Sequence, residues 1–307
     1  MIFSLRIVRN IFKNRTPVTA GASDMNSIRN KGEVMNRLFK GLVGLGMTVG
    51  FTVIANGATL AAGTEATSSD APSYFSDTEV QALWGNSFDL RSNSPEETST
   101  VTITVEHFST WRYGDNFFLM DAFLDLNGDG NSDAETTIYS EYYPSLSLSK
   151  ITGEDFSLGP VRDIFGTVGI NVDGDGFLAM LYGGKLDLKV PGFNFVNVQG
   201  YVYDTVRDPF DRDLDTTYQL TTAWQMPIVF SDRVKLFFQG FIDVIGDRGQ
   251  GVKTQFLTQP QLRLDIGALT GGREGKFFIG TEVGYWKNKF GTDVDEFVPQ
   301  VLGVFKF

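Results

Sequence analysis

The sequence contains no cysteine and only one histidine among its 307 residues. Without cysteine no disulfide can form, and such a composition is usual for proteins that cross a periplasm whose machinery makes disulfides. Basic residues are also scarce, because 26 Lys and Arg stand against 37 Asp and Glu. This acidic balance argues against a nucleic-acid partner.

Long apolar segments are missing from most of the chain as well. Beyond the N-terminal region, no segment holds the roughly 18 consecutive apolar residues that a membrane-spanning helix needs. If the body of the protein spans a membrane, it must therefore do so as a β-barrel. No low-complexity run or break in composition divides the chain, so we expect one large all-β domain.

The N-terminal region does contain an apolar segment, and it has the three-part pattern of a secretory signal peptide over residues 35–62. Arg37 and Lys40 supply the basic start, residues 41–54 are apolar, and residues 55–62 are mostly small. We expect cleavage within or just after the small residues. A signal-anchor helix is the alternative, and the small residues argue against it.

Two further segments flank this signal peptide. Residues 1–34 are basic and lack a clear pattern, and we interpret them as the product of an upstream start codon, with Met35 as the true start. Residues 63–74 are rich in Ser, Thr and Ala, which is typical of a flexible N-terminal segment. The remaining residues, 75–307, form the predicted domain.

That domain shows an alternation of side-chain character with a period of two residues. In the segment 234–244, one phase is entirely apolar or small and the other mixes charges, an amide and aromatic rings. Successive side chains of a strand point to opposite faces of the sheet, so such a strand has one apolar face and one polar face. A closed sheet with lipid outside and a polar lumen inside has this pattern.

The alternation predicts a single transmembrane antiparallel β-barrel of about twelve strands, without a long amphipathic helix. Turn residues separate the strands, and strand lengths of about 9–13 residues suit a tilted strand that crosses a bilayer. An even count places both termini on the same side of the membrane. The predicted strands are 78–86, 100–110, 116–125, 137–149, 164–171, 177–189, 195–204, 217–228, 233–245, 254–266, 276–287 and 297–307.

The charged or amide phase of each strand is the predicted inner face, and it carries aromatic rings as well as polar groups. Rings stack on flat heteroaromatic solutes, while carboxylates and amides hydrogen-bond their edges. The alternative is that the rings pack against each other and plug the barrel, or sit at the membrane interfaces. The candidate solute-binding residues are Phe117, Asp121, Phe123, Glu141, Tyr201, Phe237, Phe241, Asp243, Arg263, Glu282 and Trp286.

Four sequence blocks resemble a known family. They are EHFSTWRYGDNFFLMD (106–121), EYYPSLSLSKITGEDFSLGP (141–160), FLTQPQL (256–262) and EVGYWKNKFG (282–291). In order and spacing they resemble the Tsx-type nucleoside-specific channels of Gram-negative outer membranes. The resemblance implies a monomeric twelve-stranded barrel whose narrow lumen passes nucleosides. It assigns pore roles to Phe117, Asp121, Glu141 and Glu282.

The final strand supports the same location. It ends in Phe307, with Phe305 two residues earlier. A terminal aromatic residue on a last strand resembles the signal by which outer-membrane barrels are recognised for insertion.

An acidic turn after the third predicted strand has the ligand spacing of a calcium loop. The candidate ligands are Asp125, Asn127, Asp129 and Asp133, with a glycine at the sharp turn. Position twelve of such a loop should be a bidentate glutamate, and here it is Thr136. A solvated acidic turn is therefore the favoured interpretation, and we expect no resident metal or cofactor.

The single histidine, His107, lies two residues before Ser109 on the same strand face. This pair leaves a lipid-modifying Ser/His hydrolase as the least favoured function, because no third group orients the pair. The favoured function is a channel for nucleosides or related solutes that works by facilitated diffusion and is not an enzyme. The other alternative is a plugged barrel whose loops act as receptors. The expected partners are nucleosides, outer-membrane lipid and lipopolysaccharide.

Overall fold

The computed structural model describes residues 74–88, 98–126 and 136–307. The predicted upstream segment, the signal peptide and nearly all of the flexible segment therefore lie outside the described residues. Within the described ranges, no helix is long and apolar enough to cross a membrane.

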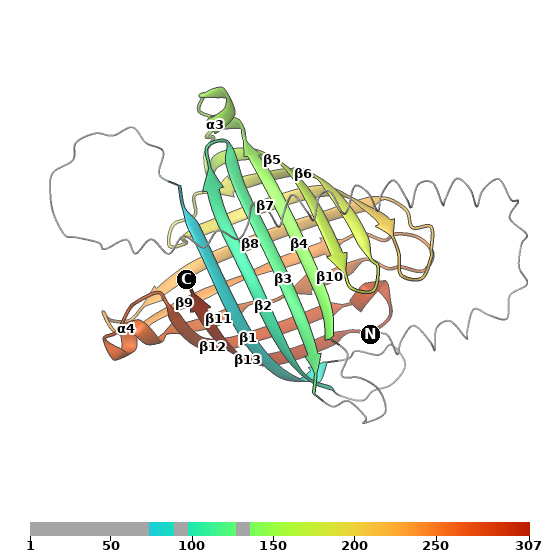
Figure 1. The fold of residues 1–307 in the computed structure, drawn as a ribbon. Coiled ribbons are helices and arrows are strands. Elements are labelled where there is room, and N and C mark those ends of the chain that lie inside the picture. Colours follow the sequence, from blue (N-terminus) through green and yellow to red (C-terminus); the bar gives the residue numbers. More distant parts are fainter. Residues whose placement is uncertain (1–73, 89–97, 127–135) are drawn as a thin grey trace, which may run out of the picture. The chain divides into compact units, whose positions relative to one another are not determined.

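The described residues form one closed antiparallel barrel (Figure 1). Neighbouring strands in the chain are neighbours in the sheet, and the first strand pairs with the last, which closes the ring. Twelve positions make up the ring, because β10 and β11 share one position between β9 and β12. The strands are β1 (Ser76–Phe88), β2 (Thr98–Trp111), β3 (Gly114–Asp125), β4 (Thr136–Ser147), β5 (Val161–Asp173), β6 (Leu178–Leu188), β7 (Phe195–Arg207), β8 (Thr217–Val229), β9 (Lys235–Ile245), β10 (Gln255–Thr258), β11 (Gln261–Asp265), β12 (Phe277–Lys287) and β13 (Glu296–Lys306).

The period-two alternation of the sequence becomes the inner and outer faces of this barrel. In β13, Phe297 is 60% exposed while its neighbour Val298 is 1% exposed, and this contrast continues along the strand. The exposed phase is apolar, as a surface in contact with lipid must be. The predicted antiparallel β-barrel is confirmed, and the C-terminal aromatic residues Phe297 and Phe305 lie on its exposed phase.

One predicted strand is divided in two. The segment predicted as 254–266 contains Pro260, which has no backbone N–H to donate to a neighbouring strand. Pairing stops between β10 and β11, although the Pro260 carbonyl still accepts from the N–H of Val283 at 3.0 Å. β10 and β11 keep the same register with β9 and with β12, so the sheet continues across the break and the barrel stays closed.

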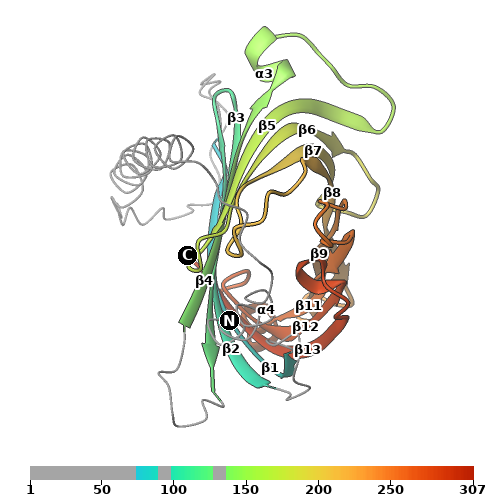
Figure 2. The same cartoon turned by 90° about the vertical axis from the view of Figure 1, so that its right-hand side faces the viewer.

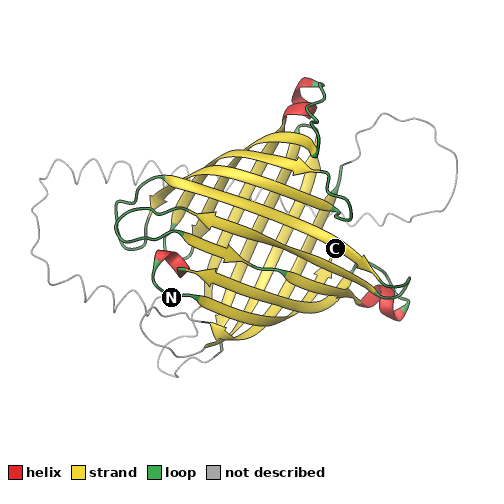
Figure 3. Ribbon diagram, turned by 180° about the vertical axis from the view of Figure 1, so that it is seen from behind, coloured by secondary structure: helices red, strands yellow, loops and turns green. Residues whose placement is uncertain are grey.

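Two short helices replace the ends of predicted strands. Ser147 ends β4 and caps α3 (Leu148–Thr152), because its hydroxyl accepts from the Lys150 N–H at 3.0 Å. Asp265 ends β11 in the same way and caps α4 (Ile266–Thr270) through the Ala268 N–H. Both caps are side-chain acceptors that compete with continued strand pairing. The secondary-structure view in Figure 3 shows how little else is helical in the described chain.

Both termini of the barrel lie at one end, as the even strand count predicts. The beginning of β1 pairs with the end of β13, and the Phe307 N–H donates to the Thr78 carbonyl at 2.9 Å. We call this end of the barrel the terminal end and the opposite end the far end.

Candidate functional site

The inner face of the barrel holds all eleven candidate residues. Each belongs to the phase of its strand that alternates with the lipid-facing side chains. Tyr201, Arg263 and Glu282 are buried, and the other eight keep part of their surface accessible. The residues do not form a single cluster, because they divide between two differently built regions.

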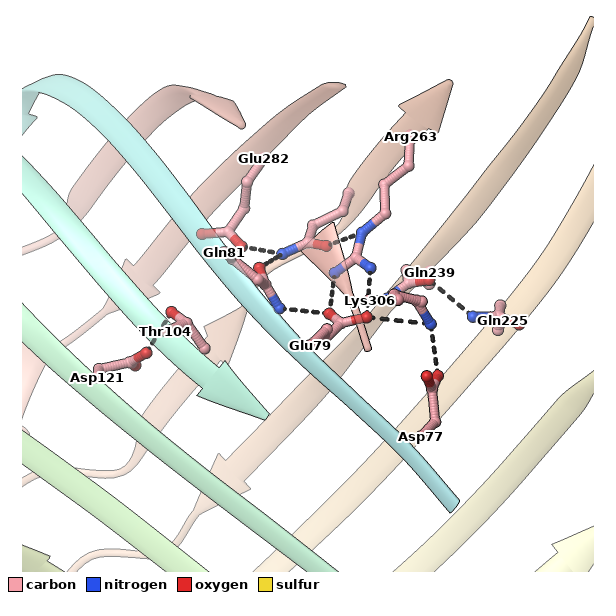
Figure 4. A network of polar contacts seen from close by, with 11 residues as sticks. Asp77, Glu79, Gln81, Thr104, Asp121, Gln225, Gln239, Arg263, Glu282 and Lys306 are labelled. Atoms are coloured by element: carbon pink, nitrogen blue, oxygen red, sulfur yellow. Dashed lines mark hydrogen bonds and ion pairs between the residues drawn. The ribbon is translucent and has the colours of Figure 1, made fainter. Parts of the chain in front are cut away.

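The first region is the inner face of β11, β12, β13 and β1, which we call the closed wall. Arg263 is 1% exposed and Glu79 is 3% exposed. The guanidinium donates two hydrogen bonds to the Glu79 carboxylate, at 3.0 and 2.8 Å (Figure 4). Lys306 adds a second cation, 2.5 Å from Asp77 and 3.1 Å from Glu79. Charges in this region are therefore neutralised where they are buried.

Amide side chains extend this network across the closed wall. Gln261 accepts from Arg263 at 2.6 Å and donates to Glu282 at 2.6 Å and to Gln81 at 3.0 Å. Gln300 also donates to Glu282, at 2.8 Å. The bond between Gln261 and Gln81 reaches from β11 to β1, so the network spans the seam between the first and last parts of the barrel.

An apolar cluster fills the rest of the closed wall. Phe237 packs edge-on against Phe278, with ring centroids 5.7 Å apart. The buried members of this cluster are Leu83, Phe278, Leu302 and Val304. Three candidate residues are therefore engaged by other side chains of the barrel. Phe237 packs against Phe278, and Arg263 and Glu282 form hydrogen bonds within the protein.

The second region comprises inner-face groups that accept hydrogen bonds, on β2–β4 and on β8–β9, which we call the acceptor faces. On β2–β4, the Thr104 hydroxyl donates to Asp121 at 2.5 Å and the Tyr139 hydroxyl donates to Glu141 at 2.6 Å. Both carboxylates stay partly exposed. The members of this half are Thr104, Glu106, Asp121 and Glu141.

The other half of the acceptor faces lies across the barrel. The Thr221 hydroxyl donates to Asp243 at 2.5 Å, and the amide nitrogen of Gln219 donates to the Thr221 oxygen at 3.0 Å. Strands β2–β3 and β8–β9 stand six positions apart in a ring of twelve, so the two halves face each other. Figure 2 shows β3 and β4 on one side and β8 and β9 on the other.

Aromatic rings connect the two halves along one side. Tyr143 lies between Phe117 and Tyr201, with ring centroids 6.5 and 5.7 Å apart. The Tyr143 hydroxyl donates to Asn171 at 2.8 Å, and the Asn171 amide donates onward to Glu141 at 3.2 Å. Phe117 remains partly exposed at the edge of this packed group. Rings and acceptors thus meet about halfway along the barrel.

Two further groups flank this middle zone. Toward the terminal end, Lys185 on β6 donates to both oxygens of Asp115 on β3, at 2.6 and 2.7 Å. Toward the far end, Trp286 stacks against Phe290 at 4.6 Å. Trp286 therefore lies away from the middle zone.

Some residues of the inner face were not identified from the sequence. Asn171 and Gln219 are uncharged residues whose importance comes from what lies opposite them: Asn171 pairs with Glu141, and Gln219 pairs with Tyr201. Glu79 belongs to the first strand, where the alternation is weak. Its partner Arg263 is 184 positions away in the sequence. Only a known register could have connected these residues.

The calcium candidates of the sequence lie mostly outside the described residues, and the His107 motif lies within them. The calcium candidates Asn127, Asp129 and Asp133 lie outside the described residues, and Asp125 is the last residue of β3. In the described ranges, no group of three His, Asp or Glu side chains could hold a metal ion. His107 faces outward and shares a 2.7 Å hydrogen bond with the Thr78 hydroxyl through Nδ1.

Comparisons with known proteins agree with this architecture. A family profile described as "Nucleoside-specific channel-forming protein, Tsx" matches residues 81–302. A protein of Vibrio parahaemolyticus named outer membrane protein OmpK is 27% identical over 125 residues, which is 39% of this chain and 46% of the relative. The protein of the same name from V. parahaemolyticus serotype O3:K6 (strain RIMD 2210633) is 26% identical over 159 residues, 48% of this chain and 58% of the relative. The chain spans about half the length of the curated relatives it matches.

Solved structures found by comparison of the fold include two that are remote in sequence. A KdgM porin covers 76% of this chain and 99% of its own at 8% identity, with a TM-score of 0.44. A bacterial polysaccharide outer membrane secretin covers 76% of this chain and 98% of its own at 10% identity, with a TM-score of 0.38.

Proposed function

Because the chain belongs to the Tsx family of nucleoside-specific channel-forming proteins of the Gram-negative outer membrane, we propose that it is a channel for nucleosides or related small heteroaromatic solutes. Solutes cross by facilitated diffusion, without an energy source and without chemical change. One observation carries the proposal: partly exposed rings stand beside partly exposed hydrogen-bond acceptors on the inner face, halfway along the barrel.

This combination matches the chemistry of a nucleoside. Stacking of a base on an aromatic side chain is typically worth about 1–3 kcal/mol. Carboxylate oxygens, such as those of Asp121 and Glu141, accept hydrogen bonds from the sugar hydroxyls and from the amino group of a base. Several weak contacts along the path favour entry while still allowing release, which conduction requires.

The surroundings of the barrel support a monomer in outer-membrane lipid. A single chain closes the ring through β1 and β13, so each copy encloses its own lumen. The outer face carries a continuous set of exposed apolar side chains, among them Trp84, Tyr182, Phe297 and Phe305. Lipid covers this surface, and lipopolysaccharide surrounds the loops at the outer side of the membrane.

Block of ion conductance in planar bilayers tests the proposal. Nucleosides added to one side should reduce the potassium current in a saturable manner. Phe117→Ala should weaken this block several-fold, because it removes an accessible ring beside Tyr143. Phe118→Ala is the matched control, since Phe118 is the same residue type on the outward phase of the same strand. Equal block in wild type and Phe117→Ala would refute the assigned role of the ring.

A second function is favoured by the dense packing of the closed wall. If the same packing fills the whole interior, the barrel is plugged and its loops serve as a receptor. A purified, folded protein that shows no conductance at all in the same bilayers would support this alternative. Conductance that passes sugars freely and ignores nucleosides would instead indicate a general pore.

A further inference from the structure

Charge is distributed unevenly over the inner face. On the acceptor faces of the described strands, four inward carboxylates form no ion pair: Glu106, Asp121, Glu141 and Asp243. The inward cations of the same strands are all paired with carboxylates, and they are Lys185, Lys235, Arg263 and Lys306. The uncompensated charge in the middle of the barrel is therefore negative.

One further positive charge lies toward the far end of the barrel. Arg248, in the loop between β9 and β10, packs over the Tyr203 ring at 5.4 Å and donates to Thr205 at 3.2 Å. This places one guanidinium toward the far end, against four carboxylates on the acceptor faces. A cleft with one sign of charge and apolar walls focuses the field and concentrates ions of the opposite sign.

Some oxygen atoms on the acceptor faces have no hydrogen-bond donor within the described chain. In the described chain, Asp121 accepts a hydrogen bond from Thr104 through Oδ1. Glu141 accepts from Tyr139 and Asn171 through Oε1. The second oxygen of each carboxylate accepts no hydrogen bond from the described residues. Gln219 gives an independent indication. It is 4% exposed, it faces inward between Tyr201 and Ile245, and its amide oxygen has no hydrogen-bond partner. A buried acceptor without a donor usually has a ligand or solvent as its partner.

Aromatic faces stand close to these acceptors. Tyr201 pairs in register with Gln219, and Phe241 lies two residues from Asp243 on the same face of β9. The face of an aromatic ring attracts a cation, and the attraction is stronger where water is partly excluded. Rings, carboxylates and an unpartnered amide oxygen thus favour the same kind of solute.

We propose that the acceptor faces make the channel selective for cations, and that among nucleosides it favours those with a fixed positive charge on the ring, such as pyridinium nucleosides. This inference rests on the proposed function for its solute class, while its ion selectivity depends only on the charges described above. A pyridinium nucleoside offers a flat ring for stacking, sugar hydroxyls as donors, and a cation for the uncompensated carboxylates.

Ion selectivity is measured first, as the reversal potential of the full-length barrel in planar bilayers under a potassium chloride gradient at neutral pH. Potassium should be several-fold more permeant than chloride. Asp121→Asn, Asp243→Asn and Glu141→Gln should each lower this ratio, and the triple variant should bring it close to one. Asp232→Asn is the matched control, because Asp232 is exposed in the turn between β8 and β9 and contributes the same formal charge.

Each variant is first checked for folding by its heat-dependent mobility in gel electrophoresis. The substitutions conserve shape, and the three single variants remain informative if the triple variant does not fold. A non-selective or anion-selective wild type would overturn the proposal. So would full cation selectivity in the folded variants.

Solute preference is measured second, with a pyridinium riboside and a neutral phenyl riboside of the same shape as blockers. The cation should block at several-fold lower concentration, and Asp243→Asn should reduce the difference. If both ribosides block equally, the inference fails and the proposed function stands. If neither blocks but the current is cation-selective, the proposed function fails and the ion selectivity stands.

Discussion

The closed wall and the acceptor faces are built from the same residue types, yet they use them in opposite ways. On the closed wall, Glu79 shares Arg263 and Lys306, so its charge is paired within the protein. On the acceptor faces, Asp121 and Glu141 receive only uncharged donors and keep part of their surface accessible. The difference shows that an inward carboxylate becomes a structural element when cations or several amide donors bind it, as they do Glu79 and Glu282, and a candidate binding group when it keeps part of its surface accessible.

The comparison also separates stability from function within one sheet. The closed wall joins β1 to β13 and β11, which are the first and last parts of the barrel. The acceptor faces lie on β2–β4 and β8–β9, inside continuous hairpins whose pairing does not depend on those side chains. Substitutions on the closed wall should therefore mainly lower the free energy of unfolding. Substitutions on the acceptor faces should mainly change the permeation of solutes.

The largest expected effect follows from breaking the closed wall. Arg263→Met leaves Glu79 buried and without its bidentate partner, which typically costs about 3–5 kcal/mol. The free energy of unfolding in detergent micelles should fall by about this amount, because Lys306 alone only partly replaces the guanidinium. Lys253→Met is the control, since its ion pair with Asp293 is exposed and should be worth about 0–1 kcal/mol. Similar losses in both variants would show that the buried network does not stabilise the seam.

A smaller loss is expected on the acceptor faces. Tyr143→Phe removes the hydroxyl that donates to Asn171 and leaves the ring between Phe117 and Tyr201 in place. Loss of one buried hydrogen bond should lower the free energy of unfolding by about 1 kcal/mol. Nucleoside block should change less than in Phe117→Ala, because the stacking surface is kept. If Tyr143→Phe lowered the free energy of unfolding as much as Arg263→Met, the proposed difference between the two regions would be wrong.

The smallest effect concerns a loop outside both regions. Burial opposes ionisation of Asp208, but hydrogen bonds from Arg212, at 2.8 and 2.7 Å, outweigh it and hold the pKa of that carboxyl below its ordinary value. The stabilisation is therefore present at neutral pH and is lost as the pH falls through this lowered pKa. Arg212→Met should raise the pKa of Asp208 in an NMR titration. Lys253→Met should leave it unchanged, and an unchanged titration in Arg212→Met would remove the assigned cause.

Most of the barrel could be predicted from the sequence because a period of two is a local property. Phe297, Val301 and Phe305 reveal the outer face without knowledge of any partner strand. The break at Pro260 and the helices capped by Ser147 and Asp265 were missed, because each depends on one side chain that competes with pairing. Such competition is decided by the neighbouring strand as well as by the segment itself.

The candidate site was predictable only in part, for the same reason. The alternation assigned Asp121, Glu141 and Asp243 to the inner face, which is a statement about each strand alone. It could not tell them from Glu282, which two glutamines bind, or from Arg263, which Glu79 binds. Whether an inward polar group is consumed or available depends on which strand lies two or three positions around the ring.

The sequence by itself determined that the chain is a closed antiparallel sheet with an apolar outside and a polar, ring-bearing inside. That information is local, since it needs only the direction in which successive side chains point. The tertiary structure decided how the inner charges are divided, because closure of the ring brings Glu79 to Arg263 across 184 positions and brings no cation to Asp121, Glu141 or Asp243 in the described chain. Pairing of buried charges is a property of the assembled ring, and it separates the closed wall from the acceptor faces.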